Sequence, residues 1–144
     1  MTDFVVVIPA RYASTRRSGK PLREINGKPM LQHVYERGAE SQASEVVIAT
    51  DDERSADAAE SFGATVCMTG EHHESGTERI AEVSDVLGWG EEQIVVNLQG
   101  DEPAMPATLI DECAALLDDP RADIATLASP MASQKDFENP NVVK

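Results

Sequence analysis

A short segment rich in small, hydroxylated and basic residues follows the first apolar run of the chain. Residues 8–22 read Ile-Pro-Ala-Arg-Tyr-Ala-Ser-Thr-Arg-Arg-Ser-Gly-Lys-Pro-Leu. Small residues leave backbone N–H groups open to a ligand, and hydroxyls and cations beside them bind phosphate oxygens well. We therefore interpret the segment as a cradle for a polyphosphate. Its candidate binding residues are Pro9, Ala10, Arg11, Ser14, Thr15, Arg16 and Lys20.

The cradle matches neither of the two common phosphate-binding loops. The dinucleotide pattern GxGxxG is absent, which disfavours a dinucleotide-dependent oxidoreductase. The pattern GxxxxGK[ST] also fails, because Ser14 stands where its first glycine belongs and Pro21 follows Lys20. An exposed basic loop without a ligand is the structural alternative.

A carboxylate follows a later apolar run, at residues 94–98. The next residues are Gln-Gly-Asp-Glu-Pro, at positions 99–103. A carboxylate held by a tight turn at a strand end suits the Mg²⁺ that accompanies a triphosphate. Asp101 is the candidate ligand for Mg²⁺, and the alternative is an ordinary turn.

Two further polar groups each have a functional and a structural interpretation. Thr50 and Asp51 end an apolar run, where either side chain could accept hydrogen bonds from a base or ribose, or cap the next helix. Ser75 and Gly76 precede a helical pattern, where they could contact an anion or ribose, or only cap that helix. Spacing alone leaves both alternatives open.

Histidine and cysteine usage predicts no zinc site and no disulfide framework. His72 and His73 are adjacent, with no further ligand at metal spacing. Cys67 and Cys113 are the two cysteines, and no CxxC pattern occurs. We expect both thiols to be free and to serve packing.

The charge distribution favours a small anionic ligand. The 144 residues carry 12 basic and 26 acidic side chains, a net charge of −14. Up to Arg37 there are seven basic and three acidic residues, a net charge of +4, whereas the remainder carries a net charge of −18. Because such a molecule repels long polyanions, we expect neither nucleic acid nor an anionic membrane as a partner.

Apolar runs alternate with helical patterns along the chain. Strands are predicted at residues 4–8, 46–49, 65–68, 94–98 and 124–127. Helices are predicted at residues 30–41, 53–62, 77–87 and 107–117. This alternation indicates βαβ units, and therefore an α/β fold with a mostly parallel sheet and helices on both faces.

This organisation places the candidate residues together and suggests a single domain over residues 1–144. Ligands of parallel sheets bind beyond the carboxyl ends of the strands, which is where the polar groups above stand. The apolar run at 4–8 follows Asp3 and ends at Pro9, which is atypical of a signal peptide, so we expect a cytoplasmic protein. Residues 139–144 look like a loop entering another strand, and we expect the natural chain to continue.

The motifs, taken in order, are similar to those of a known family. They are Val-Ile-Pro-Ala-Arg-Tyr-Ala-Ser-Thr-Arg at 7–16, Gly-Lys-Pro-Leu at 19–22, Ile-Asn-Gly-Lys-Pro-Met at 25–30, Ala-Thr-Asp at 49–51, Ser-Gly-Thr-Glu-Arg at 75–79 and Val-Asn-Leu-Gln-Gly-Asp-Glu-Pro at 96–103. The chain thus resembles the nucleotide-activating sugar transferases, and specifically the 3-deoxy-manno-octulosonate cytidylyltransferases of bacterial lipopolysaccharide synthesis. The resemblance implies a Rossmann-like nucleotidyltransferase fold.

The resemblance also implies a reaction and roles for residues. Such enzymes use Mg²⁺ and CTP to place CMP on 3-deoxy-D-manno-octulosonate (Kdo) with release of pyrophosphate, and they are dimers. By this resemblance the triphosphate would be held by Arg11, Ser14, Thr15, Arg16 and Lys20. The nucleotide region would be contacted by Thr50, Asp51, Ser75, Gly76 and Arg79, with Gln99 facing cytidine or sugar and Asp101 binding Mg²⁺. Arg11, Lys20 and Asp101 would be the catalytic residues.

Two departures from the family pattern bear on these expectations. Arg17-Ser18 replaces the usual Leu-Pro of the phosphate loop, which should make the loop more flexible. Family members are also substantially longer, so this chain would hold most of the CTP half-site and be a poor catalyst by itself. The alternatives are a CMP-sialate synthetase or related sugar nucleotidyltransferase, and a nucleotide-binding fragment without turnover.

Overall fold

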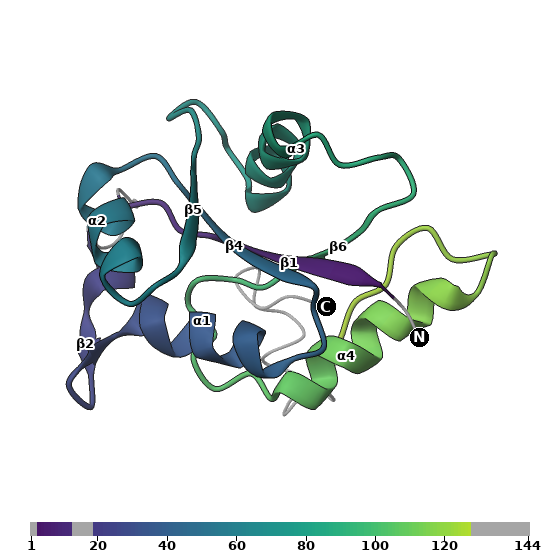
Figure 1. The fold of residues 1–144 in the computed structure, drawn as a ribbon, viewed down its shortest axis with the longest axis horizontal. Helices are drawn as coiled ribbons and strands as arrows, with labels where there is room; N and C mark the ends of the chain where they lie inside the picture. Colours follow the sequence, from purple (N-terminus) through teal and green to yellow (C-terminus); the bar gives the residue numbers. More distant parts are fainter. Residues whose placement is uncertain (1–2, 13–18, 128–144) are drawn as a thin grey trace, which may run out of the picture.

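A four-stranded parallel sheet forms the centre of the computed structural model, which describes residues 3–12 and 19–127. The strands are β1 (Phe4–Pro9), β4 (Glu45–Thr50), β5 (Thr65–Met68) and β6 (Ile94–Asn97). Their order across the sheet is β5-β4-β1-β6, so β1 lies inside it (Figure 1). Val6 pairs with Val46 on one side and Val96 on the other.

Helices cover both faces of this sheet, as the sequence predicts. They are α1 (Met30–Glu40), α2 (Glu53–Ser61), α3 (Gly76–Leu87) and α4 (Ala107–Ala115), the last followed by a 3-10 turn at Leu116–Asp118. Phe4, Val6 and Ile8 pack in one cluster with α1, α2 and α4. Val7 packs in a second cluster with α3 on the opposite face (Figure 1). This explains the continuous apolar run of β1, which is buried on both sides.

Local signals fix the limits of the helix that matters most for the site. The Ser75 hydroxyl accepts a hydrogen bond from the Glu78 N–H at 3.2 Å and so caps α3. The Glu78 carboxylate accepts from the N–H of Glu74 rather than that of Ser75, so only one of the two hydrogen bonds of a capping box forms. At the other end Gly88 has φ 69°, a left-handed conformation that glycine adopts without strain.

Two features differ from the sequence prediction. A hairpin of β2 (Glu24–Ile25) and β3 (Lys28–Pro29) turns at Asn26 and Gly27, whose φ values are 53° and 83°. Asn-Gly is the preferred sequence for this turn, so the signal was present. The strand predicted at 124–127 is wrong: that segment pairs with no described strand, and Ile124 is 87% exposed. A segment of residues with high strand propensity forms a strand only where the edge of a sheet is available to pair with its backbone.

None of the described helices combines the length and apolar character needed to cross a membrane.

Cys67 is buried on the face of the sheet that α3 covers, and both cysteines are free, as expected.

Candidate functional site

A cleft opens at the carboxyl ends of β1 and β6, where helices leave the sheet on opposite faces. The chain leaves β1 toward α1 on one face, whereas it reaches β6 through α3 on the other (Figure 1). Such a change of direction is where parallel sheets bind ligands. The cleft has a volume of about 240 Å³ and is lined by Pro9, Arg11, His73, Glu74, Ser75, Gly76, Arg79 and Gln99.

Most of the described candidate residues meet in this cleft. Pro9 and Arg11 come from the end of β1, Gln99 follows β6, and the N-terminus of α3 supplies Ser75 and Gly76. Residues far apart in sequence are thus brought together by the sheet order alone. The free N–H groups and the dipole of a helix N-terminus favour an anion at this place.

Two glycines let these segments approach closely. A Cβ at Gly76 would lie 3.2 Å from Pro9 Cγ, so a larger side chain would separate α3 from β1. A Cβ at Gly100 would lie 2.9 Å from the backbone oxygen of Pro9, a contact that real side chains do not make. Ala10 is buried, and its N–H donates to the Ala49 oxygen at 2.8 Å. Ala10 therefore supports the cleft and does not line it.

Arg79 is held inside the protein by groups from the ends of β4 and β5. Its side chain is 3% exposed. It donates to the Thr69 hydroxyl, to the Gly70 oxygen at 3.1 Å and to the Asp51 carboxylate at 3.4 Å. The guanidinium therefore ties α3 to two strand ends and fixes one wall of the cleft.

The side chains of Thr50 and Asp51 also have protein partners. Thr50 is completely buried, and its hydroxyl accepts from the N–H of Asp52 at 3.3 Å. Asp51 is 13% exposed and paired with Arg79. Asp52, rather than either residue, caps α2 by accepting from the N–H of Arg54. Neither Thr50 nor Asp51 lines the cleft in the described structure.

The candidate metal ligand and the candidate phosphate lysine form an exposed pair. Lys20 Nζ lies 3.3 Å from Asp101 Oδ2, and the two side chains are 48% and 54% exposed. Burial, together with the neighbouring charge of Asp101, raises the pKa of Glu102 above its usual 4.5. The turn after β6 therefore places two neighbouring carboxyl groups beside Lys20.

The two described ends of the phosphate segment, at Tyr12 and Gly19, are hydrogen-bonded to each other. The Gly19 N–H donates to the Tyr12 oxygen at 2.8 Å, and Arg54 stacks on the Tyr12 ring 3.4 Å from its centroid. Ser14, Thr15 and Arg16 lie outside the described residues. The Tyr12–Arg54 contact could not be predicted from sequence, because 42 positions separate the two residues.

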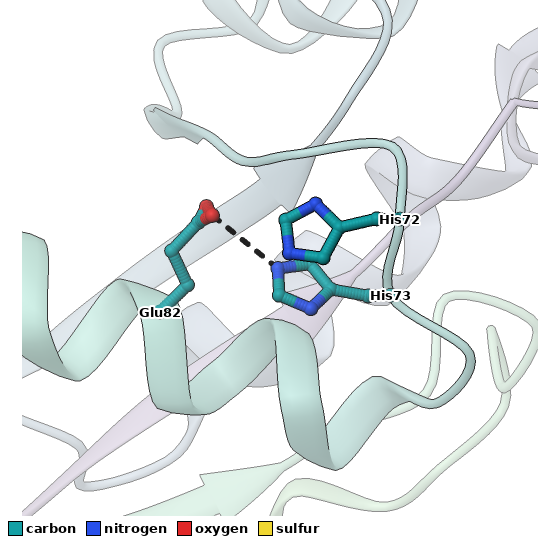
Figure 2. A group of neighbouring side chains, drawn as sticks. All are labelled: His72, His73 and Glu82. Carbon is teal, nitrogen blue, oxygen red and sulfur yellow. Dashed lines mark hydrogen bonds and ion pairs between the residues drawn. The ribbon is translucent and has the colours of Figure 1, made fainter.

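The two adjacent histidines have a third neighbour that the sequence argument missed. His73 Nε2 lies 3.3 Å from Glu82 Oε1, and His72 lies beside them (Figure 2). Spacing along the sequence offered no third ligand, but the fold brings a Glu82 oxygen within 4.8 Å of a ring nitrogen of each histidine. Glu82 is nine residues after His73 and reaches it because α3 folds back past the loop that carries the histidines.

Comparison with known proteins agrees with this architecture. The sequence model of the family described as "Cytidylyltransferase" matches residues 5–144. The chain belongs to the cytidylyltransferase family. This confirms the resemblance drawn from the motifs.

Named relatives are similar to this chain over nearly its whole length. It is 56% identical over 143 residues to the 3-deoxy-manno-octulosonate cytidylyltransferase of Pseudoalteromonas atlantica, covering 99% of this chain and 56% of that protein. It is 51% identical to the enzyme of the same name from Pasteurella multocida, again over 56% of that protein. The chain thus spans little more than half the length of these relatives.

Solved structures support the fold. A CMP:2-keto-3-deoxy-manno-octonic acid synthetase complexed with CTP aligns with a TM-score of 0.76 at 46% identity, over 83% of this chain and 49% of that chain. A nucleotidyl transferase from Methanothermobacter thermautotroptrophicus, only 15% identical, aligns with a TM-score of 0.65 over 78% of this chain and 57% of the other, which shows the shared fold alone.

Proposed function

We propose that this chain is the CTP-binding part of a Mg²⁺-dependent 3-deoxy-manno-octulosonate cytidylyltransferase. The enzyme would transfer CMP from CTP to Kdo, release pyrophosphate and supply the activated sugar for lipopolysaccharide synthesis. The observation that carries the proposal is the identity of 51–56% with relatives of that name over 99–100% of this chain. The cleft at the ends of β1 and β6 supports it, because most of the described candidate residues meet there.

The chemistry of the transfer suits these residues. The anomeric hydroxyl of Kdo would form a new O–P bond at the α-phosphorus while the bond to the β-phosphate oxygen breaks and pyrophosphate leaves. This reaction needs neutralisation of charge more than a covalent nucleophile. Arg11 lines the cleft, and Lys20 is half exposed and able to exchange Asp101 for a phosphate. The N-terminus of α3 adds N–H donors.

The residues after β6 fit a magnesium ion. Carboxylate oxygens are the ligands that Mg²⁺ prefers, and Asp101 offers an exposed carboxylate next to Glu102, whose pKa is raised in part by Asp101. Asp101 would hold the ion. Bound there, Mg²⁺ would offset the negative charge of the triphosphate.

Calorimetric titration of the chain with CTP, UTP, ATP and GTP, each with Mg²⁺, tests the nucleotide. We expect CTP to bind most tightly and the Mg²⁺-dependent part of its affinity to be lost in Asp101→Asn. Asp123→Asn, an exposed acid elsewhere, is the matched control and should bind as the unchanged chain. Equal binding of all four nucleotides by the folded chain would contradict the proposal.

Pyrophosphate release by the full-length enzyme tests the acceptor. We expect release with CTP and Kdo, little with a sialic acid, and much slower release by the 144 residues alone. Faster turnover with a sialic acid would assign the protein to CMP-sialate synthesis instead. The cytoplasmic location and the dimerisation of the full-length enzyme stay predictions.

A further inference from the structure

We propose that His72, His73 and Glu82 form a binding site for a zinc-class divalent cation, separate from the magnesium site at Asp101. The two histidines lie on the loop before α3 and Glu82 lies on α3 itself (Figure 2). One ligand atom from each side chain lies within 4.8 Å of the other two. Two imidazole nitrogens and one carboxylate oxygen are a donor set that zinc favours and magnesium does not.

The distance between two of the ligand atoms already fits a bound ion. A tetrahedral zinc site with bonds of about 2.0–2.1 Å places its ligand atoms about 3.3 Å apart. His73 Nε2 and Glu82 Oε1 are 3.3 Å apart. An ion therefore needs no movement of the loop relative to α3 to take both ligands.

His72 completes the set from the solvent side. Its side chain is exposed, and its ring lies 4.4 Å from that of His73, centroid to centroid. Figure 2 shows the two rings side by side, with Glu82 facing them across a short gap. An exposed imidazole can rotate onto an ion at little cost, and the fourth position stays open to water.

Neighbouring groups hold the two inner ligands in place. Both Glu82 oxygens accept from the Gly70 N–H, at 3.2 and 3.1 Å, so one oxygen can bind an ion while the other keeps this hydrogen bond. His73 is 9% exposed, and its Nδ1 lies 4.0 Å from Glu78 Oε2. This separation is beyond hydrogen-bond distance, so Glu78 is a neighbour of the ring and does not make the outer hydrogen bond that metal-bound histidines usually have.

Gly70 leaves the space that the His72 ring occupies. A Cβ at this position would lie 2.5 Å from His72 Cε1 and 2.6 Å from its Nδ1. Gly70→Ala would therefore displace the His72 ring without removing any ligand. This gives a variant that displaces one ligand and keeps the Gly70 N–H that donates to Glu82.

Zinc titration of the chain, followed by calorimetry and by the visible absorption of Co²⁺ as a substitute, tests the site. We expect one equivalent of Zn²⁺ to bind in the presence of excess Mg²⁺. His72→Ala and Glu82→Gln should each weaken binding by at least about 10-fold, since even outer partners of metal ligands are worth about 10- to 100-fold. Gly70→Ala should weaken binding as well.

The chain offers matched controls. His33 is its remaining histidine and bonds to the Ile25 oxygen at 2.6 Å, so His33→Gln should leave zinc affinity unchanged. Asp101→Asn should also leave it unchanged, which separates this proposal from the proposed function. Failure of the folded chain to bind Zn²⁺, or equal affinity in His72→Ala, would overturn the inference.

Discussion

Two of the candidate nucleotide-binding cations, Arg79 and Lys20, are held in opposite ways. Arg79 is 3% exposed and donates to three groups of the protein. Lys20 is 48% exposed, and its one described partner is Asp101, itself 54% exposed. Both side chains carry a positive charge, and the family resemblance implies both as nucleotide contacts.

The difference separates a residue that shapes the cleft from one that is available to a ligand. A buried charge needs its partners, because without them its removal from water is uncompensated. An exposed ion pair contributes little to stability and exchanges partners readily. Arg79 therefore acts as a positioning residue for α3, whereas Lys20 is free to bind phosphate.

Removing the Arg79 guanidinium should have the largest effect. Arg79→Leu would leave the largely buried Asp51 carboxylate without its partner, and breaking such a pair costs about 3–5 kcal/mol of unfolding free energy. Urea unfolding measures this loss. Arg121→Leu, on an arginine that is 89% exposed, is the control and should leave the unfolding midpoint unchanged. A small loss of unfolding free energy in Arg79→Leu would contradict the structural role inferred for Arg79.

The burial of Arg79 marks a limit of sequence interpretation. Its spacing after Ser75 and Gly76 correctly placed it on the first turns of α3, and the cleft does include it. The partners Asp51 and Thr69 precede it by 28 and 10 residues and come from two strand ends. Only the sheet order decides that these groups meet, so sequence could not tell a structural arginine from a ligand-binding one.

Neutralising Lys20 should leave stability almost unchanged, unlike the loss of Arg79, and should weaken CTP binding instead. Lys20→Gln should change the unfolding free energy by at most about 1 kcal/mol, because the ion pair with Asp101 is exposed. The affinity for CTP should fall about 10- to 100-fold, the value of a hydrogen bond to a charged group. Calorimetry on the same samples measures both quantities. A large stability loss with unchanged CTP affinity would reverse the roles assigned to Lys20 and Arg79.

Asp52 is intermediate between these extremes, with 20% of its side chain exposed. It caps α2, so Asp52→Ala should cost about 1 kcal/mol of unfolding free energy, and Asp52→Asn, which keeps the cap, should cost less. The Arg54 side chain lowers the pKa of Asp52 below its usual 3.8. The stabilising contribution is therefore present above pH 3.8 and is lost as the pH falls through the lowered pKa. Urea unfolding of the three proteins over this pH range measures it, and identical pH profiles would refute the contribution of the charge.

Changing Glu102 should have the smallest effect on stability. The pH dependence of its contribution should have the opposite sign to that of Asp52. Because its pKa is raised above 4.5 in the folded chain, protonation favours the folded state. Its contribution is complete below pH 4.5 and is lost as the pH rises through the raised pKa. Glu102→Gln should therefore unfold with a weaker dependence on pH above 4.5, as measured by thermal melting in a pH series. A steeper dependence in the variant would contradict the assigned shift.

Other parts of the fold were predictable where the signal was local. The apolar runs and helical spacing placed four strands and four helices within one or two residues of their observed limits. The run at 124–127 failed because pairing with a distant edge, and not its own composition, decides whether it forms a strand. Glu82 was missed beside the histidines because a loop before a helix has no fixed periodicity.

Amide NMR spectra of the chain with and without CTP and Mg²⁺ test whether the cleft at the carboxyl ends of β1 and β6 binds the nucleotide. We expect shifts concentrated at Arg11, Lys20, Ser75, Gly76 and Gln99, with the Asn26-Gly27 turn unchanged. Shifts confined to another surface, or a folded chain whose spectrum CTP leaves unchanged, would contradict it.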